Sequence, residues 1–518
     1  MPFKKSLPPF GVSLRITDVD EAASSPDLQA LQRPLEHFRA KTKHLTIHPL
    51  EQLLLWVVSA HLIFLPWALG GMRPWGQWTS LGFAIVGFVI ALIPRNYTKD
   101  HTGANSFRLI PWPRLVRFPL FWLGLAMLAY VSIQALNPAW IFVRNEKYWW
   151  MQKVVYVTWL PSGVKVPFER WGPWRMFIIY AATWLTVCSI WVGFTRRRSV
   201  QALLIVIAAN GLALAGFGVL QKLLSNGKIF WFYESQNPSF FASFVYKNHG
   251  GNYLNLTLAV TCGLAAWFYL RGLRRMEKSN PSGVFAFFAT CIAIAILVSY
   301  ARGATMAMLA FLVCCVGVFV VHQLLMKDTT RKPIVAVMLM IVFGFFMKTG
   351  LEALNSREAW SRLRQGIMEE DVSLESRLVA KEASLDMAKD YWVQGAGAGS
   401  FRFLFTLYQQ HYPSIYHEAG TQLFWEHAHN DILEITIEQG VTGLVLIIAA
   451  TGYLAVLLVR GFFWQNPLSG CVVLGALLTL VQAWWDFPFH CPAVFLLWWS
   501  LLVLATMSTQ FEELNIKS

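Results

Sequence analysis

The sequence has few charged residues for its length. Only 14% of its 518 residues are Asp, Glu, Lys or Arg, whereas a water-soluble domain usually carries about 25%. Hydrophobic residues make up 56% of the chain and gather in long runs. This scarcity of charge excludes an ordinary soluble domain and indicates a protein that crosses a membrane many times.

The sequence has no cysteine within a long polar loop, and no cleavable signal peptide is visible. All seven cysteines lie in or at the edge of an apolar run: Cys188, Cys262, Cys291, Cys314, Cys315, Cys471 and Cys491. A disulfide framework and a structural zinc site are therefore not expected. The first 50 residues are polar, so the first apolar span is expected to act as its own signal anchor.

The charge that is present is mostly positive, with a formal net charge of +14 at pH 7. Such an excess suggests nucleic acid in a soluble protein, but no basic stretch is interleaved with the aromatic surface that single-strand binders show. We interpret the basic residues as holding loops in the cytoplasm and contacting anionic lipid. Membrane lipids, and no nucleic acid, are the expected partners.

Twelve apolar stretches come close to the 17 to 25 residues that cross a bilayer. They are about 53–71, 78–94, 118–136, 175–194, 200–221, 252–270, 284–300, 303–325, 333–350, 433–458, 470–485 and 491–508. Basic clusters in the short loops place both termini in the cytoplasm and the loops 137–174, 222–251 and 351–432 outside. The predicted fold is an all-α polytopic membrane protein with about twelve transmembrane helices and a large external loop containing amphipathic helices.

The external loop 351–432 has its own pattern. Leu374, Leu378, Leu385 and Tyr391 recur near helical spacing with charges between them, which predicts an amphipathic helix on the membrane surface or capping the bundle. The glycine-rich stretch 395–401 resembles a nucleotide loop, but no strand precedes it and no βαβ unit surrounds it. It is instead predicted to be a tight turn packed under the histidines that follow.

These histidines lie in the segment FWEHAHNDILEITIEQG, residues 424–440, directly before an apolar span. A pair at i, i+2 on an extended segment can bind a metal, with Glu426 or Asp431 completing the site. Alternatively, Asn430 or Asp431 caps a helix and the histidines are solvated. A third interpretation is a general base with a pKa near neutrality, beside a helix end that suits a phosphate.

Three further polar insertions occur near the ends of apolar spans. Arg302, in VSYARGATMAML, separates two spans and is either a snorkelling arginine or a fork for a diphosphate. Arg377 is a second candidate for the diphosphate, although a charged residue on a surface helix is commonly just solvated. The segments 246–252 and 486–490 are also polar. The predicted topology brings all of them to one external face, which indicates an active site there.

The polar segments, taken together and in order, resemble the O-antigen ligase/polymerase superfamily of bacterial membrane glycosyltransferases. The matching pieces are FVYKNHGGNYL (244–254), SYARGA (299–304), ESRLVAKEASLDMAKDYWVQGAGAGSF (375–401), HAHNDILEITIEQGVTG (427–443) and WDFPFHCPA (485–493). They span about half of the chain, from 240 to 505. The N-terminal half matches only in having the expected spans.

The resemblance implies transfer of a glycan from undecaprenyl diphosphate to an acceptor hydroxyl at the periplasmic face of the bacterial inner membrane, with inversion and without metal or cofactor. It makes His429 the first candidate for the base and His427 the second. It assigns the diphosphate to Arg302 and Arg377. The sequence departs from the family where Lys247 stands in place of a common arginine, and lysine supplies a charge without a fork. The implied pocket residues are Asn248, His249, Asn430 and Asp486.

The resemblance also implies partners and a division of the chain. The acceptor is a lipid A core (ligase) or a growing glycan (polymerase), with a protein O-oligosaccharyltransferase of the same superfamily or a lipid-linked glycan flippase as alternatives. The expected regions are a cytoplasmic tail (1–52), an N-terminal transmembrane region (53–240), a ligase-like core (241–508) and a second cytoplasmic tail (509–518).

Overall fold

The computed structural model describes residues 46–98, 106–235, 239–276, 279–325, 344, 372–418, 421–422 and 424–517. The chain divides into two compact units, 1–46 with 97–107 and 47–96 with 108–518. All helices and the site described below belong to the second unit.

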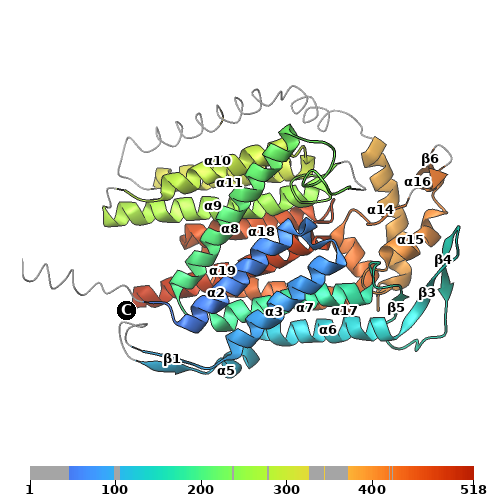
Figure 1. The fold of residues 1–518 in the computed structure, drawn as a ribbon, viewed down its shortest axis with the longest axis horizontal. Coiled ribbons are helices and arrows are strands. Elements are labelled where there is room, and N and C mark those ends of the chain that lie inside the picture. The colour runs from blue at the N-terminus through green and yellow to red at the C-terminus, as the bar shows by residue number, and fades with distance from the viewer. Residues whose placement is uncertain are drawn as a thin grey trace, which may run out of the picture. The chain divides into compact units, whose positions relative to one another are not determined.

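This unit is mostly helical (Figure 1). Its helices are α2 (Pro49–Trp67), α3 (Pro74–Leu92), α5 (Pro111–Val116), α6 (Pro119–Leu136), α7 (Pro173–Gly193), α8 (Arg197–Leu223), α9 (Lys247–Arg275), α10 (Ser282–Val298), α11 (Arg302–Leu325), α14 (Val372–Tyr391), α15 (Phe401–Gln409), α16 (Pro413–Tyr416), α17 (Asp431–Arg460), α18 (Pro467–Gln482) and α19 (Pro492–Lys517). Short 3-10 turns are η2 (Leu69–Gly71), η3 (Phe463–Gln465) and η4 (Pro488–His490). The strands are β1 (Arg95–Tyr97), β2 (Phe107–Leu109), β3 (Pro138–Arg144), β4 (Trp149–Lys153), β5 (Gly163–Lys165), β6 (His417–Glu418) and β7 (Thr421–Gln422).

Eight of the described helices are long and apolar enough to cross a membrane, and three more apolar helices are shorter. Each predicted span except 333–350 overlaps one of these helices. The stretch 333–350 lies outside the described residues apart from Gly344. The chain is therefore a multi-pass membrane protein, and the count of about twelve spans stays a prediction.

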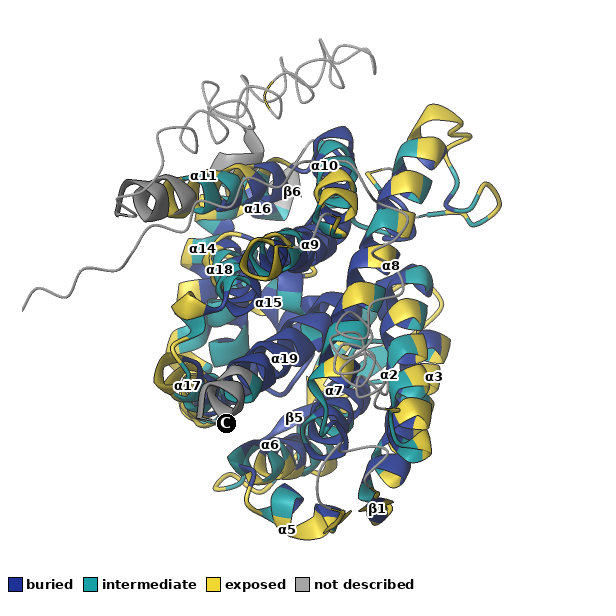
Figure 2. Cartoon of the chain, turned by 90° about the vertical axis from the view of Figure 1, so that its left-hand side faces the viewer, coloured by how far each residue is buried: buried dark blue, intermediate teal, exposed yellow. Residues whose placement is uncertain are grey.

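The bundle is built around α19. In its apolar window 89% of the residues are buried, against 17% in α17, and Figure 2 shows α19 as a buried helix among its neighbours. Leu497, Leu501 and Leu504 of α19 have no exposed surface. Side chains that face outward from the peripheral helices, such as Trp56 and Trp122, are suited to contact with lipid.

The region between α6 and α7 is not helical. It forms a three-stranded sheet in the order β4-β3-β5, with β3 antiparallel to β4 and parallel to β5. The Asn145 side chain accepts hydrogen bonds from the backbone N–H groups of Lys147 (3.0 Å) and Tyr148 (2.6 Å), which closes the turn between β3 and β4. The all-α prediction missed this sheet, although aromatic and β-branched residues on both sides of the turn are the usual signal for it.

The predicted amphipathic helix is present as α14, and its leucines are not the residues that pack against the protein. Leu378 and Leu385 are 60% and 46% exposed, and the side chain of Leu374 lies outside the described part of the chain. The buried residues are Ala380, Ala383 and Met387. Small alanines allow α14 to approach α15 and α17 closely, so packing distance rather than side-chain hydrophobicity decided the orientation.

Candidate functional site

A glycine-rich loop, residues 395–399, connects α14 to α15 and packs against the start of α17. Gly395, Gly397 and Gly399 have φ angles of 74°, 104° and 75°, in the region that favours glycine. A methyl group on Gly395 would lie 2.2 Å from the Glu438 carbonyl oxygen of α17. The Glu438 carboxylate in turn accepts hydrogen bonds from the N–H groups of Gly399 (2.7 Å) and Phe401 (3.0 Å). The loop is thereby fixed to the first turns of α17.

The histidine segment enters α17 through a cap. The Asn430 side chain accepts a hydrogen bond from the Leu433 N–H at 3.0 Å, as the capping interpretation predicts. His429, directly before the cap, has a φ of 49°. This left-handed residue breaks the extended geometry that the sequence suggested for the histidine pair. Both rings contact Phe487, but the polar surroundings of His427 and His429 differ.

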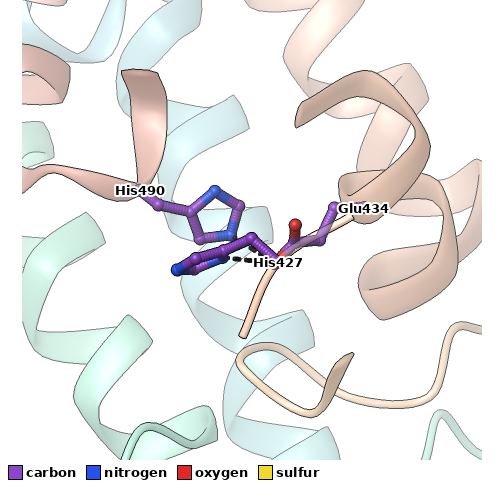
Figure 3. Close-up of side chains that lie close together, drawn as sticks. All are labelled: His427, Glu434 and His490. Carbon is purple, nitrogen blue, oxygen red and sulfur yellow. Dashed lines mark hydrogen bonds and ion pairs between the residues drawn. The ribbon is translucent and has the colours of Figure 1, made fainter. Parts of the chain in front are cut away.

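His427 belongs to a buried ionic network with Glu434 and His490 (Figure 3). Its Nδ1 lies 2.8 Å from Glu434 Oε1, and His490 Nε2 lies 3.1 Å from the same oxygen. His490 Nδ1 lies 2.6 Å from Asp431 Oδ1. The second oxygen of each carboxylate also accepts a hydrogen bond. The Ala428 N–H donates to Glu434 Oε2, and the Phe489 N–H donates to Asp431 Oδ2.

These contacts determine where the protons lie. Both nitrogens of His490 face carboxylate oxygens, so both must donate and the ring is an imidazolium. Burial alone would lower the pKa of His490, but Glu434 and Asp431 outweigh it and raise that pKa well above its usual value. His427 Nε2 faces the Arg402 guanidinium at 3.2 Å and therefore accepts. Burial lowers the pKa of His427 to about 3 despite Glu434, so His427 is neutral.

His427, Glu434 and His490 could also be considered as metal ligands. Among the described residues they form the one group of His, Cys, Asp and Glu side chains whose ligand atoms all lie within 4.8 Å of one another. A metal ligand must offer a free lone pair. His490 uses both nitrogens as donors, and His427 uses Nε2 for Arg402. A metal would have to break these hydrogen bonds, so the arrangement fits an ion-pair network better than a metal centre.

His429 lies in different surroundings. Its Nδ1 is buried and has no protein hydrogen-bond partner among the described residues. Its ring contacts Trp425 and Phe487 edge to face, with centroid distances of 5.8 and 5.0 Å. Burial, helped by the charge of Arg377, lowers the pKa of His429 to about 4. The prediction of a pKa near neutrality is therefore wrong for His429, because desolvation favours the neutral ring.

Arg377 of α14 connects His429 to the start of α9. Its guanidinium hydrogen-bonds the Tyr246 hydroxyl, and its charge acts on His429 and Asp486. Asn248 donates to Asp486 Oδ2 and to the Tyr246 hydroxyl, both at 2.8 Å. Burial raises the pKa of Asp486 to about 6. Four predicted site residues, from four segments distant in sequence, thus lie together.

Phe487 is the centre of this assembly. Its ring stacks on Tyr246 and on His427 with centroid distances of 5.2 and 4.3 Å, and it meets His249 edge to face at 5.2 Å. His249 Nε2 also lies 3.2 Å from the Phe487 carbonyl oxygen. One phenylalanine therefore contacts three rings from two distant segments, the start of α9 and the histidine segment before α17.

The two remaining predicted residues lie at helix starts. Lys247 is the half-buried first residue of α9, and its N–H donates to the Ser239 carbonyl at 2.9 Å. Arg302 is exposed at the first position of α11. Its neighbour Gly303 lies against the amide of Gln482 and the indole of Trp485, just before Asp486. No contact that places Arg302 on His429 is seen among the described residues.

The sequence was also compared with known proteins. Residues 284–448 match a family model described as O-antigen ligase. This part of the chain is similar to the O-antigen ligase superfamily. The matched region contains Arg302, Arg377 and both histidines of the 424–440 segment. No curated protein matches the chain at a significant level.

Three residues of this candidate site were missed from sequence: Glu434, His490 and Arg402. Glu434 follows the cap by one helical turn, and that spacing places it on the same side as Asp431. His490 was visible as a polar residue in WDFPFH, but nothing in its neighbourhood indicates two carboxylate partners from α17. Arg402 precedes the histidines by 25 residues and reaches His427 only because α15 folds back against α17.

The His490 network is expected to make the stability of the protein pH-dependent. Because the pKa of His490 is raised in the folded state, its contribution is complete below the unfolded value of about 6.5 and is lost as pH rises toward the raised pKa. Thermal unfolding of the purified protein between pH 6 and 9 should show a falling midpoint. In His490→Gln this alkaline slope should be absent, and a slope equal to wild type would contradict the assignment.

Proposed function

We propose that the protein transfers a glycan from undecaprenyl diphosphate to an acceptor hydroxyl at the periplasmic face of the bacterial inner membrane. The observation that carries this proposal is the Nδ1 of His429, which has no partner among the described residues and lies within the electrostatic reach of Arg377, in the region that matches the O-antigen ligase family. A neutral imidazole and a fixed cation are the two groups that such a transfer needs, one for the proton and one for the leaving diphosphate.

In the proposed reaction the acceptor oxygen attacks the anomeric carbon from the side opposite the diphosphate. A bond forms between the acceptor oxygen and the anomeric carbon, and the bond from that carbon to the diphosphate oxygen breaks. The acceptor proton passes to His429 Nδ1, and the bonding electron pair leaves on the diphosphate. The product carries inverted stereochemistry at the anomeric carbon.

The leaving group is stabilised by guanidinium groups. Arg377 is the first candidate because it lies among His429, Tyr246 and Asp486. Arg302 is the second, at the exposed start of α11. Removing one such preorganised donor costs about 2.7–4 kcal/mol of transition-state stabilisation in comparable enzymes.

Binding of the lipid diphosphate donor also changes the pKa of His429, the proposed base. The charge of Arg377 helps to hold the pKa of His429 at about 4 in the absence of a ligand. An anionic diphosphate on Arg377 reverses this influence and stabilises protonated His429. The base thus becomes stronger only when the donor is in place. His427 is the weaker candidate, because Glu434 and Arg402 occupy both of its nitrogens.

The lipid chain of the donor requires an apolar path. A groove between α6, α7, α17 and α19 is lined by apolar side chains that include Met127, Trp184 and Phe495. Tyr180, which also lines the groove, accepts a hydrogen bond of 2.6 Å from Gln439 of α17. The groove therefore begins close to the α17 turn that carries the ionic network and suits a polyprenyl tail.

The proposal is tested by incubating the purified protein with undecaprenyl-diphosphate glycan and either a lipid A core or a second lipid-linked unit. Transfer to the core means ligase, and extension of the lipid-linked chain means polymerase. We expect activity to survive EDTA, because the nitrogens of His427 and His490 are engaged in hydrogen bonds.

Two results would overturn this function. Loss of activity with EDTA and recovery with a divalent metal would move the chemistry to a metal at the His427 network. Absence of any covalent product, with lipid-linked glycan crossing a bilayer, would identify a flippase. Transfer only to a protein serine would keep the chemistry and change the acceptor.

A further inference from the structure

Helices α9 and α18 run side by side in opposite directions (Figure 1). Their register follows from two contacts. Asn248 donates to Asp486 at the outer end, and Gly475 lies against Ala259 three turns deeper. The same register places Asn252 opposite Gln482 and Asn255 opposite Thr479, because residues three and four apart share a helix face.

Asn252 and Gln482 are unusual in that neither amide is paired. Each is only 1% exposed, yet no protein group among the described residues completes the hydrogen bonds of Asn252 Nδ2 and Oδ1 or of Gln482 Nε2 and Oε1. Asp486 Oδ1, one turn further out, is likewise without a protein partner. Buried polar groups normally have partners because leaving them unpaired costs free energy.

The unpaired amides of α9 and α18 are bordered on a third side by the start of α11. Asn255 donates to the Ala304 carbonyl at 2.9 Å, and Gly303 lies against Gln482 Nε2. Residues 303 and 304 carry little or no side chain, so α11 approaches the amides without covering them with apolar atoms. The unpaired amides therefore lie at a junction of three helices, directly inward of Asp486 and beside Arg302.

The chemistry of the walls indicates the ligand. Amides offer donors and acceptors without charge, and the one charged group is a carboxylate. A phosphate would bring a further negative charge against Asp486, whereas sugar hydroxyl or acetamido groups can use every one of these atoms. We propose that Asn252 and Gln482, with Asp486 at the outer end, form a subsite for a sugar ring.

The subsite rests on the proposed glycan transfer and adds a specificity element to it. Asp486 is contacted by Asn248 and lies within the electrostatic reach of Arg377, so a ring in this subsite is adjacent to the proposed diphosphate position. The ring belongs either to the donor or to the acceptor, since both present the same hydroxyl chemistry. Kinetics with each substrate distinguishes them.

The test uses the full-length protein with Asn252→Leu and Gln482→Met, which keep the side-chain size and remove the polar atoms. Thr479→Val is the matched control, because Thr479 lies one turn deeper on the same face and its hydroxyl already donates to the Gly475 carbonyl at 3.0 Å. For each variant we would measure the KM for donor and acceptor, the thermal midpoint, and binding of undecaprenyl diphosphate with and without its glycan.

Each amide variant should raise one KM about tenfold, the loss of one neutral hydrogen bond, and should leave binding of the glycan-free lipid unchanged. A rise in the KM for the donor would show that the subsite holds a donor sugar, and a rise in the KM for the acceptor would show that it holds an acceptor sugar. The thermal midpoint should not fall. Thr479→Val should behave as wild type.

Two outcomes would overturn the subsite. If the amide variants weaken binding of the glycan-free lipid as much as binding of the glycan-bearing lipid, the amides bind the diphosphate. A lowered thermal midpoint with both KM values unchanged would mean that they only support the helix junction. If wild type binds the glycan-bearing lipid without any transfer, the proposed function fails, and the two binding measurements alone decide the subsite.

Discussion

His429→Ala should lower kcat by about 10²- to 10⁴-fold, the usual contribution of a positioned general base. The histidine is the proposed proton acceptor, and no other described group is shown to occupy its Nδ1. Binding of the lipid diphosphate should stay close to wild type, because the guanidinium groups that hold it are untouched. The measurement is the initial rate of glycan transfer together with donor binding.

The control for this variant is His411→Ala, which removes an exposed histidine before α16 and should leave kcat unchanged. The pH profile gives an independent check. Because the pKa of His429 is about 4 without ligand, the acid limb of kcat/KM from this group should lie near pH 4 rather than near 6.5. A second limb near pH 6 that disappears in Asp486→Asn belongs to Asp486. Full activity of His429→Ala would remove the histidine-base mechanism.

Glu434→Gln should lower the free energy of unfolding by about 3–5 kcal/mol, the usual cost of removing one partner of a buried ion pair. The Glu434 carboxylate faces both His427 and His490 and accepts from the Ala428 N–H. The amide cannot balance the His490 imidazolium. The loss is measured by chemical or thermal unfolding in detergent near neutral pH.

Glu382→Gln is the matched control, because Glu382 is exposed on α14 and the same change there should cost less than about 0.5 kcal/mol. Replacing Asp431, Glu434 and His490 together by neutral side chains should recover much of the stability, since Asp431 and Glu434 both pair with His490 and only the triple change removes the buried charges together. Glu434→Gln with wild-type stability would show that the network contributes nothing to the fold.

The membrane helices were predictable because each is encoded by a local run of apolar residues as long as a bilayer is thick. The cap at Asn430 was predictable for the same reason, since an N-cap depends on a few adjacent residues. The face of α14 was not predictable from its leucines. Which side of a helix is buried depends on the neighbours that it meets, and here Ala380 and Ala383 meet α15 and α17.

The sequence by itself determined that the chain crosses a membrane, that polar segments interrupt the ends of its spans, and that residues 284–448, which contain several of these segments, match the O-antigen ligase family. Only the tertiary structure decided the different surroundings of the two histidines. His427 and His429 are two residues apart, yet Glu434, Arg402 and His490 surround the first and Arg377 acts on the second. The electrostatic state of a side chain depends on groups within a few ångströms, and these come from segments that are distant along the chain.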